Sequence, residues 1–277
     1  MKKKPYLNAD IGISSLIWNA SDLKLALEIL KSYNIRSIDL TPWEYLGPGW
    51  QFDDAVNLSA LVKHYDINIV GMQGLYYGIS NANIFDLKSG RAEFVRRSIE
   101  CIRLAGILGA RYLIAGAPGT RQLRNSMSKE TAKFVYAEIL GALVPLLERE
   151  NLIYCIEPVS VSYGEELVTS SMVAFEICSM VRSPFVRINF DSGFSTRENY
   201  TEIIRGVEFI GHGHLSKYDH SIINTKCLYE FEVDEIADNW SIEVAKTGSL
   251  DDLYVLCRLL NKFKYENRIF SDCSSSY

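Results

Sequence analysis

The segment FIGHGHLSKYDH, from Phe209 to His220, holds three of the four histidines in the chain. Its first part predicts a strand over residues 209–215. Side chains two residues apart on a strand point to the same face, so we expect His212 and His214 on one side of it. Imidazole is a common ligand for divalent metals, but one or two imidazoles do not make a site. A metal site here therefore requires carboxylates from elsewhere in the chain.

Short apolar or β-branched runs alternate along the chain with longer stretches whose apolar residues recur at helical spacing. The pattern predicts strands over residues 11–18, 35–40, 67–73, 111–116, 153–157, 185–191, 209–215 and 240–244. It predicts helices from about residue 21, with Ser21 as N-cap, and over about 54–65, 92–108, 129–150, 171–181, 199–207 and 250–263.

Alternating strands and helices call for a parallel sheet, because parallel neighbours need a crossover connection. Eight such units in 277 residues predict a (β/α)8 TIM barrel, one domain over residues 1–277 with a polar tail at about 271–277. The alternative is an open doubly wound sheet. It is disfavoured because no GxGxxG or P-loop motif follows any expected strand.

Composition excludes several classes of protein. A net charge of −5 gives no reason to expect nucleic acid as a partner, and no run of about 18 apolar residues predicts a membrane span. The six cysteines are scattered without a CxxC pair, which favours reduced core thiols and a cytoplasmic location. The basic start of the chain lacks the apolar region of a signal peptide.

Polar residues stand at the ends of four consecutive expected strands: Glu157, Asp191, His214 and Glu243, separated by 34, 23 and 29 residues. In a TIM barrel the chemistry lies at the carboxyl ends of the strands, so these four side chains are expected at one rim. A carboxylate at the end of an apolar strand is costly to bury unless it is paired or bound to a metal. Three carboxylates and an imidazole suit Mn²⁺, Co²⁺, Mg²⁺ or Zn²⁺.

The chain resembles the xylose isomerase-like superfamily of sugar isomerase and epimerase TIM barrels. The motifs that carry the resemblance are GAPGTR (116–121), IEPVSVSYG (156–164), FDSG (190–193), HGHLSKYDH (212–220) and WSIEV (240–244). The resemblance implies that Glu157, Asp191, His214 and Glu243 bind the metal and that the two glutamates also act as acid and base. It implies isomerisation or epimerisation of a sugar or sugar phosphate by proton abstraction next to a carbonyl, through an enediolate.

The sequence departs from that family in two places. Phe194 stands where many members carry a substrate-binding histidine, and Lys217 replaces an acidic residue that often follows the histidine ligand. Alternatives therefore remain open: a lyase or dehydratase acting on a keto-sugar or polyol with the same metal site, or an inactive sugar-binding barrel. An abasic-site endonuclease, which also occurs on similar barrels, is disfavoured by the small number of histidines and the negative charge.

Five further residues near the expected rim are predicted to bind substrate. Gln73 ends a strand and would bond sugar hydroxyls, while Arg121 and Lys217 would meet an anionic group. His212 is expected to form part of the wall or to support a ligand, and His220 lies in the loop after its strand.

Other expectations concern binding partners and one structural residue. The expected partner is a small carbohydrate, with no nucleic acid and no membrane, and a homodimer is a further expectation. Asp39, which ends another strand, is expected to make a structural hydrogen bond.

Overall fold

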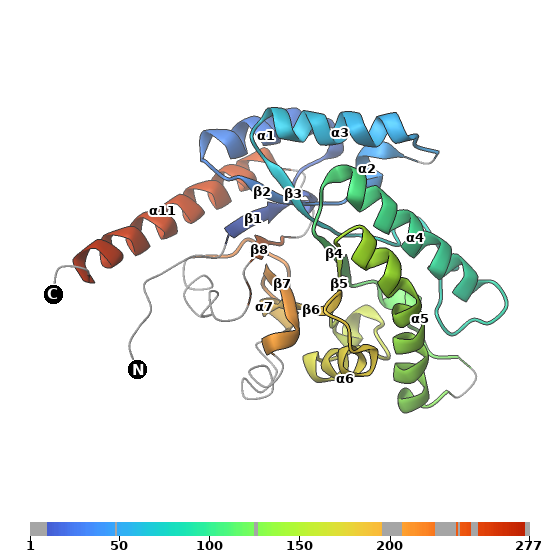
Figure 1. Cartoon of the computed structure of the whole chain (residues 1–277). Coiled ribbons are helices and arrows are strands. Elements are labelled where there is room, and N and C mark those ends of the chain that lie inside the picture. The colour runs from blue at the N-terminus through green and yellow to red at the C-terminus, as the bar shows by residue number, and fades with distance from the viewer. Residues whose placement is uncertain are drawn as a thin grey trace.

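A computed structural model describes residues 10–47, 49–124, 127–195, 207–224, 237, 239–244 and 249–274, and of residues 10, 195 and 265–274 it describes the backbone alone. Its eight strands form a closed parallel barrel in sequence order, in which the last strand pairs with the first (Figure 1). The strands are β1 (Asp10–Ser14), β2 (Ser37–Leu40), β3 (Asn68–Met72), β4 (Tyr112–Ala115), β5 (Ile153–Ile156), β6 (Val186–Asp191), β7 (Ile210–Leu215) and β8 (Asn239–Ile242). The predicted TIM barrel is confirmed.

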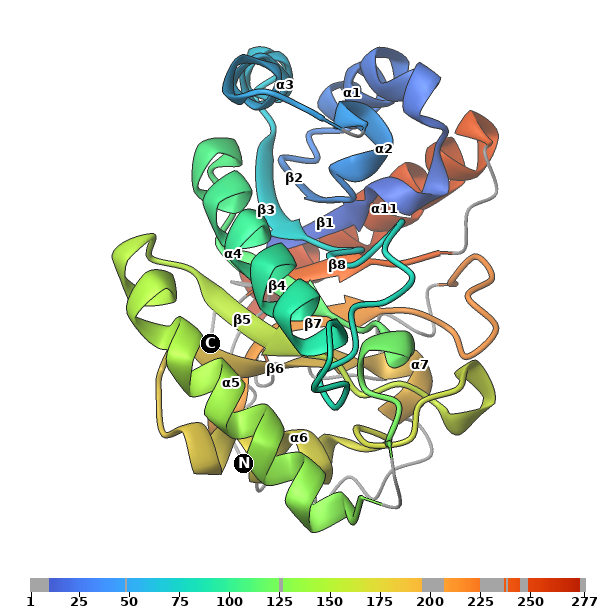
Figure 2. The ribbon, with the colours of Figure 1, turned by 90° about the vertical axis from the view of Figure 1, so that its right-hand side faces the viewer.

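Helices surround this barrel on the outside (Figure 2). The α-helices of the described chain are α1 (Leu23–Ser32), α2 (Trp43–Leu46), α3 (Phe52–His64), α4 (Gly90–Leu108), α5 (Lys129–Arg149), α6 (Ser171–Val181), α7 (Ser192–Ser195) and α11 (Leu250–Ser274). Short 3-10 helices cover Ser15–Ile17, Ala20–Asp22, Pro118–Thr120, Val161–Tyr163 and Val207–Phe209. The first and last large helices, α1 and α11, pack on each other, so the helical layer closes as the barrel does.

Local chemistry explains where several helices begin and end. Ser128 and Ser170 cap α5 and α6 by accepting hydrogen bonds from Thr131 N and Val173 N, at 3.2 and 3.4 Å. Gly109 ends α4 with a φ of 78°, the left-handed conformation that glycine adopts without a Cβ penalty, as its position in the sequence predicts.

Some predicted boundaries are wrong. Ser21 does not cap α1: a 3-10 turn over Ala20–Asp22 comes first, and the N-cap is Asp22. The first strand stops at Ser14 because its hydroxyl accepts from Leu16 N, at 3.2 Å, and starts a tight turn. The helix α11 continues to Ser274, so it includes part of the segment read as a polar tail. The helix predicted over 199–207 lies outside the described residues, apart from Val207.

The core lies between the barrel and its helices and extends into the barrel itself. Trp240 on β8 is 2% exposed and packs against Gly213 of β7, where an added Cβ would be 2.4 Å from its ring. Glycine at this position therefore makes room for the indole. Four cysteines whose side chains the structure describes, Cys101, Cys155, Cys178 and Cys257, are free and buried. No helix in the described part of the chain is long and apolar enough to cross a membrane.

Candidate metal centre

The barrel brings the four predicted ligands to one point at the carboxyl ends of β5 to β8. Asp191 is the last residue of β6 and pairs in register with His214 on β7. Glu157 and Glu243 each follow directly after their strands, β5 and β8. Each residue offers one donor atom, and these four atoms all lie within 4.8 Å of one another. Three carboxylates and one imidazole can therefore surround a single ion.

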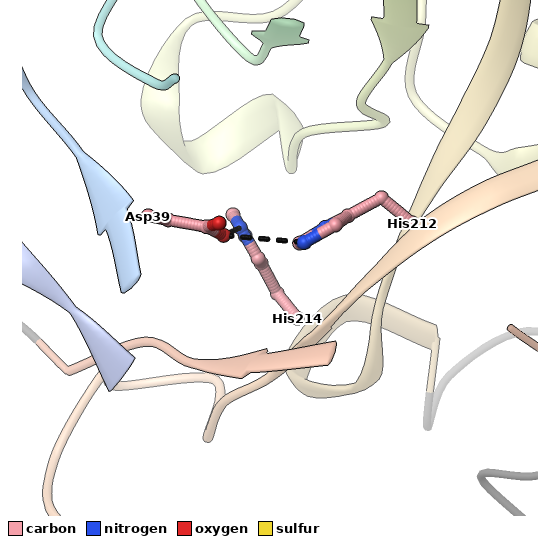
Figure 3. A group of neighbouring side chains, drawn as sticks. All are labelled: Asp39, His212 and His214. Atoms are coloured by element: carbon pink, nitrogen blue, oxygen red, sulfur yellow. Dashed lines mark hydrogen bonds and ion pairs between the residues drawn. The ribbon is translucent and has the colours of Figure 1, made fainter. Parts of the chain in front are cut away.

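The orientation of His214 fits a metal ligand. Its Nε2 lies 3.3 Å from Oδ2 of Asp39, which is wholly buried beneath it (Figure 3). Its Nδ1 lies 2.9 Å from Glu157 Oε1 and 3.2 Å from Glu243 Oε2, yet neither contact has hydrogen-bond geometry. A proton held on Nε2 by Asp39 leaves the Nδ1 lone pair free to bind an ion, which is the arrangement that metal-binding histidines adopt. The predicted structural role of Asp39 agrees with this contact.

The carboxylates of the centre are crowded, and one of them resists ionisation. Burial, followed by the nearby charges of Glu243 and Glu157, raises the pKa of Asp191 to about 7. Burial alone would lower the pKa of His214, but Glu243, Glu157 and Asp39 outweigh it and raise that pKa well above its usual value. A divalent cation would favour the ionised form of Asp191, so the residues present fit a metal ion.

Glu157 is held on several sides. Its Oε1 accepts a 2.6 Å hydrogen bond from Asn189 Nδ2, and its other oxygen lies over the backbone of Gly116. A Cβ on Gly116 would come within 1.8 Å of that oxygen, so only glycine fits below the carboxylate. Behind it, Arg121 donates to the Glu157 carbonyl oxygen from both terminal nitrogens at 3.2 Å. Both the backbone and the carboxylate of this residue are therefore fixed.

A cavity of about 280 Å³ opens beside the donor cluster. Three of the four candidate ligands line it together with an apolar and aromatic wall; the lining residues are Gly116, Pro118, Glu157, Val159, Tyr163, Asp191, Phe194, His220 and Glu243. The rings of Tyr163, Phe194 and His220 pack edge to face, with centroids 5.7 to 6.1 Å apart. The cavity therefore has a charged end and an aromatic side.

Of the five predicted substrate contacts, all of which the structure describes, only His220 lines this cavity, with Nδ1 4.0 Å from Glu243 Oε2. Arg121 is 1% exposed, and its guanidinium forms a 2.6 Å ion pair with the buried Glu165. The prediction that it meets an anionic ligand is corrected, because its donors are already used. Lys217 is half-buried and is not among the lining residues.

The predictions that Gln73 and His212 bind substrate are also corrected. Gln73 is buried and donates from Nε2 to Ser14 Oγ at 3.0 Å and to Glu243 Oε1 at 3.4 Å, so its amide supports a candidate ligand. His212 is 1% exposed and lies behind Glu157, with Nδ1 2.8 Å from Asn189 Oδ1. Its predicted supporting role, and not substrate contact, agrees with this position.

Two residues of the site were missed from the sequence. Asn189 bonds Glu157, and Ser216 donates its hydroxyl to Asp191 Oδ1 at 2.5 Å. Each stands two residues from a predicted ligand, Asn189 before Asp191 and Ser216 after His214. The two-residue period of a strand was the available signal, since it places such side chains on the same face.

The fold and the four strand-end donors define a TIM barrel with a candidate metal centre at its rim. A family model described as xylose isomerase-like TIM barrel matches residues 27–270. The chain belongs to this family. No curated protein sequence is significantly similar to it.

Solved structures of several sugar epimerases share the fold. An L-ribulose 3-epimerase superposes with a TM-score of 0.76 at 16% identity, over 97% of this chain and 98% of that one. A D-psicose 3-epimerase from Clostridium cellulolyticum H10, solved with D-tagatose, gives 0.73 at 11% identity over 92% and 98%. An IolI protein with a bound zinc atom gives 0.65 at 16% identity over 94% and 96%. At these sequence identities, the structural similarity shows a shared fold and nothing further.

Proposed function

We propose that the chain is a divalent-metal-dependent isomerase or epimerase acting on a sugar or sugar phosphate. The observation that carries this proposal is the convergence of Glu157, Asp191, His214 and Glu243 within 4.8 Å at the wall of a cavity. Similar folds solved as sugar 3-epimerases, and one solved with zinc, support it. Mn²⁺, Co²⁺, Mg²⁺ or Zn²⁺ would suit the donor set.

The bound ion would polarise a substrate carbonyl and the neighbouring hydroxyl, which acidifies the carbon between them. Glu157 and Glu243 both line the cavity, so either carboxylate can take a proton from that carbon and the other can return one. The return of the proton to the opposite face of the same carbon gives epimerisation, and its transfer to the next carbon gives isomerisation.

The remaining cavity residues would hold the sugar. His220 stands beside Glu243 and can bond a hydroxyl, while Phe194 and Tyr163 offer apolar faces to sugar C–H groups. Phe194 in place of a histidine removes a polar contact at this wall. We infer that substrate orientation depends more on the metal and on packing than on hydrogen bonds from the β6 loop.

The test combines metal analysis with solvent proton exchange. We expect about one divalent ion per wild-type chain after reconstitution, and incorporation of deuterium from D₂O into a free or phosphorylated ketose, followed by NMR. Glu243→Gln should abolish the exchange, whereas Glu208→Gln, at an exposed glutamate, should leave it unchanged. If the protein binds metal but none of the tested sugars exchanges protons with solvent, the result would contradict the proposed enzymatic activity and favour a sugar-binding barrel. A product with ultraviolet absorbance from a conjugated carbonyl would indicate a lyase.

A further inference from the structure

We propose that His212 is a positioning residue for the candidate ligand Glu157 and that it acts through Asn189. The inference rests on the proposed function, because it concerns the metal centre of that function. His212 itself touches neither the cavity nor any of the three carboxylate ligands in the contacts described above. Its effect must therefore pass through the side chain between it and Glu157.

The direction of each hydrogen bond between Glu157, Asn189 and His212 follows from the chemistry of the Glu157 carboxylate. An ionised carboxylate can only accept, so Asn189 must turn its NH₂ group toward Glu157 Oε1, at 2.6 Å. The amide oxygen of Asn189 then faces His212 Nδ1 at 2.8 Å, and an amide oxygen can only accept. His212 must therefore carry a proton on Nδ1. If that donor is lost, the amide oxygen of Asn189 loses this partner, and of these two hydrogen bonds only the one to Glu157 still orients the amide.

Beyond His212, on the side away from Asn189, lies Asp39 of β2. Its Oδ2 lies 3.3 Å from His214 Nε2, with hydrogen-bond geometry, and 3.4 Å from His212 Nε2, so one carboxylate oxygen lies close to both imidazoles (Figure 3). Asp39, Asn189 and both histidines are at most 1% exposed. In such surroundings a lost hydrogen bond is not replaced by bulk water, so the network keeps one arrangement.

The two glutamates of the metal centre therefore differ in how firmly their carboxylates are held. Glu157 has one oxygen bonded to Asn189 and the other against Gly116, whereas within the described residues Glu243 accepts one long hydrogen bond, of 3.4 Å, from Gln73. Glu157 is thus held in the conformation that faces the other donors. Loss of an outer partner of this kind typically weakens metal binding by about 10- to 100-fold.

Two substitutions at His212 separate the two contacts that it makes. The amide nitrogen of asparagine reaches about as far as Nδ1, so His212→Asn keeps a donor for Asn189. The longer glutamine places its amide nitrogen near Nε2, so His212→Gln keeps the contact with Asp39 and loses the donor. Mn²⁺ binding to each full-length variant is measured by isothermal titration calorimetry, and the melting temperature of each metal-free protein is measured beside it.

We expect His212→Gln to weaken Mn²⁺ binding by about 10- to 100-fold and His212→Asn to bind within about threefold of the wild type. Both metal-free variants should melt at similar temperatures. Equal binding by all three proteins would overturn the inference, and so would an equal loss in both variants, which would mean that only the imidazole volume matters. Failure of the wild type itself to bind Mn²⁺ would instead reject the proposed metal site and the inference with it.

Discussion

At the scale of single residues, Gly116 leaves the space that the candidate ligand Glu157 occupies. Alanine at this position would place a methyl group 1.8 Å from Glu157 Oε2 and 2.9 Å from its carboxyl carbon. The backbone just after β4 and the carboxylate cannot both keep their places, so the Glu157 carboxylate must shift from its position among the donors.

We therefore expect Gly116→Ala to weaken divalent-metal binding by about tenfold or more, as measured by calorimetric titration with Mn²⁺. Gly119→Ala is a matched control three residues along the same loop, because its added Cβ would meet nothing within 4 Å. Equal metal affinity in the two variants would show that Glu157 does not need its present conformation.

The protonation of Asp191 predicts a pH dependence of metal binding. Burial and the neighbouring carboxylates raise its pKa to about 7, so below that pH the metal-free protein holds a proton that the ion must displace. The raised pKa of His214 adds a second proton in the same direction. Mn²⁺ affinity should therefore fall by about tenfold or more from pH 8 to pH 6. An affinity that stays constant over this range would contradict the assignment of Asp191 as a ligand.

At the scale of elements, a buried ion pair joins the loops after β4 and β5. Arg121 binds Glu165 through Nε at 2.9 Å and also donates to the carbonyl oxygens of Ala115 and Glu157. Glu165 in turn accepts from the backbone N–H groups of Leu167 and Val168. Each charge thus has several partners, and the two loops are fixed relative to the strand that carries Glu157.

Removing one partner of this pair leaves the other charge buried. We expect Arg121→Met to lower the free energy of unfolding by about 3–5 kcal/mol, measured by chemical denaturation of the metal-free protein. Arg149→Ala, at an exposed ion pair with Glu150, should change it by only about 0.5 kcal/mol. Similar losses in both variants would show that the buried pair contributes no more than a surface pair.

At the scale of the whole molecule, the candidate metal centre joins four strands of the closed barrel, so metal binding and global stability are linked. Mn²⁺ at about 100 times its dissociation constant should stabilise the folded state by about 2.7 kcal/mol and raise the melting temperature by roughly 5 °C. Asp191→Asn should remove this effect, since it takes away a ligand. An equal rise in that variant would place the bound ion elsewhere.

A cytoplasmic location and a homodimer stay predictions from the sequence. The homodimer can be checked by light scattering of the purified protein.

The sequence by itself determined the barrel and the four candidate ligands. Strand–helix alternation permits few topologies, and parallel strands bring their carboxyl ends to one rim, so Glu157, Asp191, His214 and Glu243 could be placed together without coordinates.

Only the tertiary structure decided what the other polar residues do. Arg121 sits in the predicted loop, but its partner Glu165 is 44 residues away, and His214 and its partner Asp39 are 175 residues apart. The direction of a side chain depends on such distant neighbours and on which of them are buried with it. No local pattern in the sequence contains that information. This is why Arg121, Gln73 and His212 were predicted to bind the substrate, although their side chains bond other groups of the protein.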